Sequence, residues 1–230
     1  MAYNMADLII TIDGPAASGK STAARLLARR LNASFLDTGA MYRAVTLAAM
    51  QAGVDFKDED KLLRVIQNTD FQFSIEDDTM MVSIDGTDVT EEIRKPYITA
   101  NVRYIASCPK AREQLVQMQR QFAEEPRKIV TEGRDQGTVA FPDADIKFYL
   151  IADLDERAKR RQTDLRSQGG DDSLERIQDA LEQRDTGDRS RTVGPLKPAE
   201  DAVIIDTTHL TIDGVVDELL SWVKRGGAPI

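Results

Sequence analysis

The run from Gly14 to Ser21 constrains this chain more than any other stretch, because it fits the pattern G-x-x-x-x-G-K-[ST]. An apolar, β-branched run at 8–12 precedes it and predicts a buried parallel strand. The segment 21–31 follows, with alanines and leucines at the spacing of an amphipathic helix. Strand, loop and helix in this order favour a phosphate-binding loop over a glycine-rich turn that only caps a helix.

Each residue type in this loop has a physical reason. Gly14 and Gly19 permit the backbone to fold closely around a phosphate, in conformations that a side chain would forbid. Lys20 can reach the β- and γ-phosphate oxygens, and the Ser21 hydroxyl can ligate Mg²⁺. The predicted contacts with a nucleoside triphosphate are Gly14, Pro15, Ala16, Ala17, Ser18, Gly19, Lys20, Ser21 and Thr22.

Length and charge limit the partners of the chain. Its 230 residues suffice for one large domain or one domain with an insertion. The formal net charge of −9 argues against nucleic-acid or anionic-membrane partners. No apolar run approaches the length of a membrane span, and the single cysteine excludes an internal disulfide and fits a reducing compartment. We therefore expect a cytoplasmic protein. We also expect a monomer, because no long exposed apolar stripe stands out.

The order of apolar runs predicts an α/β fold. Helical patterns separate the five central strand candidates, which implies crossover connections and a mostly parallel sheet. These candidates are 8–12, 34–36, 128–131, 146–151 and 202–206, and a last helix is expected near 212–224.

Two segments depart from this alternation. The β-rich runs 71–75 and 80–84, with Asp85-Gly86 as a two-residue turn signal, predict a small antiparallel insertion, followed by helices near 97–106 and 109–123. The segment 155–191 is charged and helical, and Gly169-Gly170 divides it. A solvated face is the ordinary interpretation of such charges. Several arginines beside a phosphate site favour a mobile lid instead.

The phosphate loop alone leaves GTPases, ATP-driven machines and small kinases open. The sequence has no N-K-x-D-type base-reading motif, and the chain is short for a motor, which leaves a small-molecule kinase. Such an enzyme needs a second anion site and a lid that excludes water. Arg43, Arg94, Arg112 and Arg134 are candidates for that site, and Arg134 comes just after the strand at 128–131. Glu132, at the same edge, is predicted to hold the water shell of Mg²⁺.

Several separated motifs resemble those of the bacterial-type cytidylate kinases, the CMP/dCMP kinases of the nucleoside monophosphate kinase group. They cover segments 12–22, 36–43, 132–138 with 141–144, and 184–195 with 205–208. The resemblance implies a P-loop kinase fold: a five-stranded parallel sheet flanked by helices, a monophosphate-binding subdomain with a small antiparallel sheet insertion, and a helical lid. Within a single domain, 1–230, it implies a core at 1–38, 126–154 and 200–230, a monophosphate-binding subdomain at about 39–125 and a lid at about 155–191.

The resemblance also implies a reaction, transfer of the γ-phosphoryl group of ATP to CMP or dCMP with Mg²⁺, giving ADP and CDP or dCDP. Asp135 and Arg112 would read cytosine, whose amine needs an acceptor and whose N3 and O2 need donors. The implied CMP contacts are Thr38, Arg43, Arg103, Arg112, Arg134, Asp135, Arg184, Asp188 and Arg191. Arg160 and Arg161 of the lid are expected near the ATP phosphates, and the implied catalytic set is Lys20, Arg134, Arg160 and Arg191.

One position departs from the family's pattern. Relatives commonly carry a cytosine-contacting serine where this chain has Arg103. Either Arg103 supplies a replacement donor, or it points away and Arg112 reads the base alone. Two other functions stay open: a kinase for UMP or another small phosphate acceptor, and a nucleotide-sensing module without turnover. A clamp for an acceptor phosphate argues against the second, because a sensor does not need one.

Overall fold

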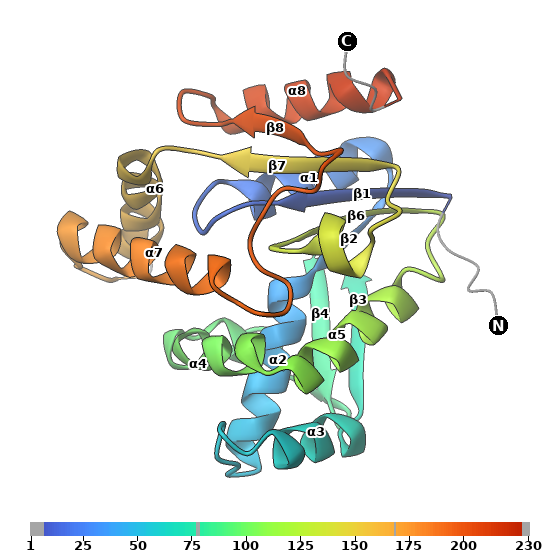
Figure 1. The fold of residues 1–230 in the computed structure, drawn as a ribbon, viewed down its shortest axis with the longest axis vertical. Helices are drawn as coiled ribbons and strands as arrows, with labels where there is room; N and C mark the ends of the chain where they lie inside the picture. Colours follow the sequence, from blue (N-terminus) through green and yellow to red (C-terminus); the bar gives the residue numbers. More distant parts are fainter. Residues whose placement is uncertain (1–6, 77–78, 168, 227–230) are drawn as a thin grey trace. The chain divides into compact units, whose positions relative to one another are not determined.

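The structure, a computed structural model, describes residues 7–76, 79–167 and 169–226. The chain divides into two compact units. The first unit comprises Asp7 and residues 32–129, and the second comprises residues 8–31 and 130–226. Figure 1 labels most of the helices and strands of both units, and each unit is described by itself below.

The larger sheet of the described residues has five strands, in the order β2-β6-β1-β7-β8. Strand β1 pairs in parallel with β7, with Ile10 opposite Ile146, and β7 pairs in parallel with β8. Both β1 and β7 are buried along nearly their whole length, as expected for parallel strands covered on both faces. The predicted α/β sheet is confirmed. Its strands are β1 (Leu8–Asp13), β2 (Ser34–Asp37), β6 (Lys128–Gly133), β7 (Ile146–Ile151) and β8 (Val203–Asp206).

The helices of the second unit form two pairs. Helix α1 packs against β1 and against α8, and α6 packs against α7. The charged segment is divided near its glycine pair as predicted, because α6 ends before Gly169 and α7 begins after Gly170. These elements are α1 (Lys20–Leu31), α6 (Leu154–Ser167), α7 (Leu174–Arg189), α8 (Ile212–Lys224) and a short π-helix, η2 (Gln136–Ala140).

The first unit is built around α2 (Thr38–Gln51), which is buried along most of its length. It packs against α4 and α3, and also against β4 of the smaller sheet. A helix that is apolar on most of its faces must be central in this way. The surrounding elements are α3 (Glu59–Asn68), β3 (Phe71–Glu76), β4 (Thr79–Ile84), β5 (Thr87–Asp88), η1 (Glu92–Arg94), α4 (Pro96–Ser107) and α5 (Pro109–Phe122).

The predicted antiparallel insertion is confirmed as the sheet β3-β4-β5. Asp85 and Gly86 connect β4 to β5 with φ values of 49° and 77°. Positive φ at both central residues is the backbone of a type I′ turn, which suits the twist of a two-residue hairpin. The Asp-Gly pair therefore fixes the register that places Ile84 opposite Thr87.

Helix α3 is an element that the sequence analysis did not predict. Leu62 and Ile66, one turn apart, are its buried residues, and Leu63 and Val65 are partly buried. Its start did carry a signal, because the Asp58 side chain accepts a hydrogen bond from the Lys61 amide at 3.0 Å. An aspartate in this capping position satisfies an amide that the first turn leaves unpaired.

The division into units differs from the segments implied by the family resemblance. The boundaries lie after Leu31 and after Ile129, and both helices of the expected lid belong to the second unit. The assignment of core, monophosphate-binding and lid roles to these segments stays a prediction. In the part of the chain that the structure describes, no helix combines the length and the apolar character that a membrane crossing needs.

Candidate active site

The phosphate loop lies between the end of β1 and the start of α1. Gly14 has a φ of 151°, and a Cβ atom at this position would lie 2.3 Å from the backbone oxygen of Leu150 in β7. Gly19 has a φ of 87°. Both conformations disfavour side chains. The close approach of β7 is therefore a second reason why position 14 requires glycine, and the motif alone does not show it.

Lys20 begins α1 and is buried in the second unit. Its Nζ donates a hydrogen bond to the backbone oxygen of Pro15 at 3.0 Å. Burial, followed by the nearby Arg134 guanidinium, lowers the pKa of Lys20 to about 7, against a smaller opposing effect of Glu132. The Lys20 ammonium therefore loses its proton more readily than the ammonium of an exposed lysine does.

Ser21 and Glu132 meet beside this lysine. The Ser21 Oγ donates to Glu132 Oε1 at 2.9 Å, and Glu132 is buried near the end of β6. A hydroxyl and a carboxylate are the hard oxygen ligands that Mg²⁺ prefers, so this pair fits the predicted metal role. The described residues contain no cluster of three or more His, Cys, Asp or Glu side chains that could bind a metal unaided. Phosphate oxygens and water molecules would have to complete the coordination, as is usual for Mg²⁺.

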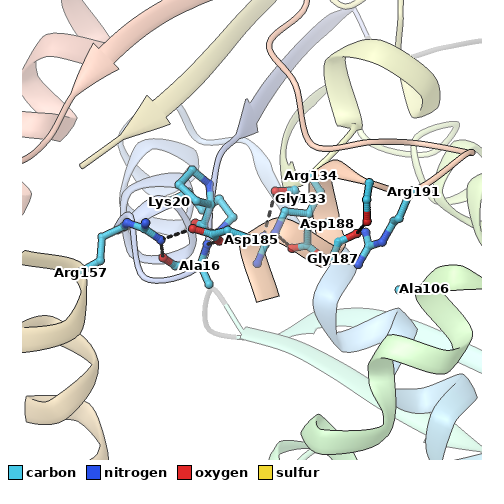
Figure 2. Close-up of polar contacts among 12 residues, drawn as sticks. Ala16, Lys20, Ala106, Gly133, Arg134, Arg157, Asp185, Gly187, Asp188 and Arg191 are labelled. Carbon is cyan, nitrogen blue, oxygen red and sulfur yellow. Dashed lines mark hydrogen bonds and ion pairs between the residues drawn. The ribbon is translucent and has the colours of Figure 1, made fainter. Parts of the chain in front are cut away.

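A group of arginines converges on one carboxylate, Asp188 of α7. Arg134 Nε donates to Asp188 Oδ2 at 2.8 Å, and Arg191 donates to Asp188 Oδ1 (Figure 2). Burial would raise the pKa of Asp188, but Arg134 and Arg191 outweigh it and hold the pKa below its usual range. Arg184 keeps an exposed surface, yet desolvation and the charge of Arg134 lower its pKa to about 10. We call Arg134, Arg184, Asp188 and Arg191 the arginine cluster.

Asp135 is buried at the N-terminal end of η2, which directly follows β6. The position of η2 depends on Asp13, the last residue of β1. Its Oδ1 accepts from the Gln136 amide at 2.9 Å, and its Oδ2 accepts from the Gly137 amide at 2.8 Å. Burial raises the pKa of Asp13 to about 7, although the two amides oppose this rise. Asp13 therefore anchors the turn that carries Asp135.

Arg160 of α6 lies close to the phosphate loop, because a Cβ atom on Gly19 would lie 3.8 Å from its Nη1. Its guanidinium donates to Thr207 Oγ1 at 3.1 Å and to the Thr207 backbone oxygen at 2.5 Å. Thr207 in turn donates to the Ser18 backbone oxygen at 3.1 Å. The structure thus places Arg160 beside the loop, and its contact with the ATP phosphates stays a prediction. Arg161 is near enough to Arg184 to contribute to its lowered pKa.

Four of the predicted CMP contacts belong to the first unit. Thr38 begins α2, and Arg43, on the same helix, donates to Asp37 Oδ2 at 3.2 Å. The Arg43 Nε is buried and has no hydrogen-bond partner among the described residues. Arg112 is buried, donates to the Ala106 backbone oxygen at 3.1 Å and lies 5.6 Å from the Tyr42 ring centre.

Arg103, the fourth, lies on the surface of the first unit. Its guanidinium lies 4.9 Å from the Tyr104 ring centre and donates to the Tyr104 hydroxyl at 3.1 Å. Tyr104 also stacks on Phe56, with ring centres 5.2 Å apart. Stacking and a hydrogen bond hold Arg103 in place. Its use as a cytosine donor would require this contact to change.

The sequence analysis missed Asp13 and a buried ion pair between Arg157 and Asp185. Asp13 did carry a signal, since a carboxylate ends an otherwise apolar strand. Arg157 Nη1 and Asp185 Oδ2 lie 2.6 Å apart, and both side chains are buried. Their charged helical segment contains many similar residues, so no pattern singles these two out.

The second unit thus places a phosphate loop, a buried lysine, an oxygen pair suited to Mg²⁺ and the arginine cluster at the carboxyl ends of parallel strands. In open α/β sheets this edge is where ligands bind. Fold and site together define an α/β protein of the phosphate-loop class that binds phosphorylated ligands.

Comparison with known proteins narrows this class. The sequence matches the family described as Cytidylate kinase over residues 10–225. It is 46% identical over 217 residues to a cytidylate kinase of Desulforamulus reducens, covering 94% of this chain and 97% of that protein. It is 42% identical over 215 residues to a cytidylate kinase of Bacillus cereus, covering 94% of this chain and 95% of that protein. The chain belongs to the cytidylate kinase family.

Solved structures give a weaker likeness. A shikimate kinase from Bacteroides thetaiotaomicron is 13% identical, with a TM-score of 0.48, and the match covers 94% of this chain and 98% of that chain. The fold assignment rests instead on the parallel sheet and on the small antiparallel sheet of this chain itself.

Proposed function

We propose that the chain catalyses ATP-dependent phosphorylation of CMP and dCMP, giving ADP and CDP or dCDP. One observation carries this proposal: in a member of the cytidylate kinase family, Lys20, the Ser21–Glu132 pair and the arginine cluster occur together in the second unit. A phosphate loop alone would serve a nucleotide sensor equally well. A buried carboxylate that holds two arginines supports a second, acceptor phosphate.

The donor role falls to the phosphate loop. Its amides bind the ATP phosphates, and Lys20 leaves Pro15 to contact the transferring γ-phosphoryl group. The negative phosphates raise the pKa of Lys20 from about 7, so the bound lysine carries a full charge. Arg160, held beside Gly19 by Thr207, supplies a second cation on the donor side. Positioned charge of this kind is the main protein contribution to phosphoryl transfer.

The acceptor roles follow those that the family resemblance implies. In this proposal Arg43 and Arg134 bind the CMP phosphate, where the guanidinium fork matches a dianion. Arg112 and Asp135 read cytosine as donor and acceptor. The ribose hydroxyls donate to Asp188, while Arg184 and Arg191 contact the phosphates. When the arginines leave Asp188 and bind phosphate, each guanidinium keeps a negatively charged partner.

Ser21 and Glu132 would hold Mg²⁺, with Glu132 acting through water. When bound, the ion would neutralise negative charge on the phosphates during the transfer. The protein residues orient the two substrates for in-line attack by the CMP phosphate oxygen, and we propose no obligatory general base. Exclusion of water, which prevents ATP hydrolysis, falls to the helices of the expected lid.

An ADP-release assay with MgATP and a panel of CMP, dCMP, UMP, AMP and GMP tests the proposal. We expect the highest kcat/KM values with CMP and dCMP. We also expect Lys20→Ala to lower kcat by about 10²–10³-fold or more, because it removes a charge at the transferring group. Fastest turnover with UMP would favour the other acceptor class, and ATP binding without ADP release would favour a sensor.

The Arg103→Ala variant tests the remaining ambiguity in base recognition. A raised KM for CMP with an unchanged KM for ATP would make Arg103 a base contact, while unchanged values would leave Arg112 as the base-reading donor. We further propose that the protein is a cytoplasmic monomer. Light scattering during size-exclusion chromatography tests the second part of that statement.

A further inference from the structure

Two buried residues form hydrogen bonds with the backbone of the phosphate loop. Neither belongs to any of the predicted contact sets. Arg157 of α6 and Asp185 of α7 form an ion pair with an Nη1–Oδ2 distance of 2.6 Å, and their side chains are 7% and 2% exposed. Both lie in the second unit, and Figure 2 shows them pointing toward one another and toward Ala16. A buried pair of this kind is not an automatic gain in stability, so its position needs a reason.

The pair binds both backbone polar groups of one loop residue. Asp185 Oδ1 accepts from the Ala16 amide at 3.3 Å, and Arg157 Nη1 donates to the Ala16 carbonyl oxygen at 3.1 Å. Arg157 Nε also donates to the Ala152 carbonyl oxygen at 3.1 Å, just after β7. The sheet end, the two helices and the loop are therefore joined through a single guanidinium.

The two hydrogen bonds to Ala16 lie next to a strained position of the loop backbone. Ala17, the next residue, has a φ of 60°, a left-handed conformation that is unfavourable for a residue with a Cβ atom. Such a conformation persists only where its surroundings enforce it. Ala16 also packs with Ala158, Ile177 and Leu181 of α6 and α7, so polar and apolar contacts hold the same segment. The amides that follow Ala17 are the ones that must point at phosphate oxygens.

We propose that Arg157 and Asp185 are positioning residues for ATP, which hold the phosphate loop in its anion-binding shape by fixing the Ala16 peptide groups. The inference rests on the proposed function only in taking the loop as the ATP site. Asp185 also lies one helical turn from Asp188 on α7, so the same turn carries the loop anchor and the centre of the arginine cluster.

Binding of ADP, followed by isothermal titration calorimetry, tests the proposal without turnover. Asp185→Ala is expected to weaken ADP binding by about 10-fold or more, the effect of one lost charge-assisted hydrogen bond. Asp185→Asn keeps an oxygen for the Ala16 amide, so its loss should be smaller. Arg157→Lys should resemble Asp185→Ala, because an ammonium lacks the fork that reaches Asp185, Ala16 and Ala152 together. In turnover assays the KM for ATP should rise more than the KM for CMP.

Asp201→Asn is the matched control, because it breaks the ion pair with Lys147 in the same unit, away from the loop. It should leave ADP binding unchanged. ADP affinity within two-fold of the wild type in folded Asp185→Asn and Arg157→Lys would overturn the proposal, even with lowered Tm values, since stability alone would then explain the pair. If no monophosphate is phosphorylated, but wild-type ADP binding is normal and these variants lose it, the inference stands and the proposed acceptor chemistry fails.

Discussion

Replacement of Asp188 by asparagine removes the carboxylate to which two partly buried arginines, Arg134 and Arg191, donate hydrogen bonds. Its side chain is 5% exposed, and those of Arg134 and Arg191 are 16% and 13% exposed. Loss of one partner from such an arrangement costs about 3–5 kcal/mol when burial is complete. Partial exposure of the arginines and the remaining amide oxygen reduce this, so we expect a loss of about 2–4 kcal/mol in the free energy of unfolding. For a chain of this size that lowers Tm by about 5–15 °C.

The pH dependence gives this prediction its sign. The pKa of Asp188 is held below its usual value in the folded protein, so its contribution is fully present above the unfolded pKa. It is lost as the pH falls through the folded pKa. The difference in unfolding free energy between the wild type and Asp188→Asn should therefore be constant near neutral pH and should shrink in strong acid.

Urea unfolding at several pH values measures this difference. Asp179→Asn is the control, because Asp179 lies exposed on the same helix. Inorganic phosphate should stabilise Asp188→Asn more than the wild type, since it supplies the missing negative charge to Arg134 and Arg191. A loss below 0.5 kcal/mol, or a loss matched by Asp179→Asn, would refute the reasoning that the cluster needs its carboxylate.

Three further predictions concern Lys20, Gly14 and Asp13. At pH 8, Lys20 should take up a proton when ATP binds, because its pKa is about 7 in the free protein. Calorimetry in buffers of different ionisation enthalpy measures this uptake, and a heat of binding that does not depend on the buffer would contradict it. Gly14→Ala should abolish ATP binding and lower Tm, because its Cβ would lie 2.3 Å from the Leu150 oxygen, whereas Gly187→Ala, which meets nothing within 4 Å, should not lower Tm. The free energy of unfolding of the wild type should exceed that of Asp13→Asn by less and less as the pH rises from about 4 to 7. Since the pKa of Asp13 is raised in the folded protein, its contribution to stability is fully present only below the pKa of the unfolded state. Unfolding curves at pH 4, 5.5 and 7 measure this, and a constant or growing advantage would contradict it.

The sequence predicted the elements whose signals are local. Buried parallel strands need continuous apolar runs, so β1 and β7 were predicted within a residue of their bounds. The Asp85-Gly86 pair specified its hairpin because few residues adopt two consecutive positive φ values. Helix α3 was missed although its signals are local, because Leu62, Val65 and Ile66 have the spacing of an amphipathic helix and Asp58 stands at the capping position.

Some residues of the candidate site likewise carry a local sequence signal, and others do not. Lys20 and Ser21 follow from a contiguous pattern, because the loop and its ligand contacts lie within one stretch of chain. Arg157 and Asp185 are 28 residues apart in the sequence and surrounded by similar charges, so only the packing of α6 against α7 distinguishes them from solvated residues. Asp13 lies between these cases, since its place at a strand end is visible, but its two amide partners come from a turn 123 and 124 residues away.

Phosphorus NMR of the protein with MgATP and CMP tests the central claim most directly, because it follows both products at once. The account predicts that CDP and ADP appear in equal amounts and that inorganic phosphate does not accumulate. Lys20→Ala should abolish both products over the same period. Release of ADP with inorganic phosphate and without CDP would contradict phosphoryl transfer to CMP.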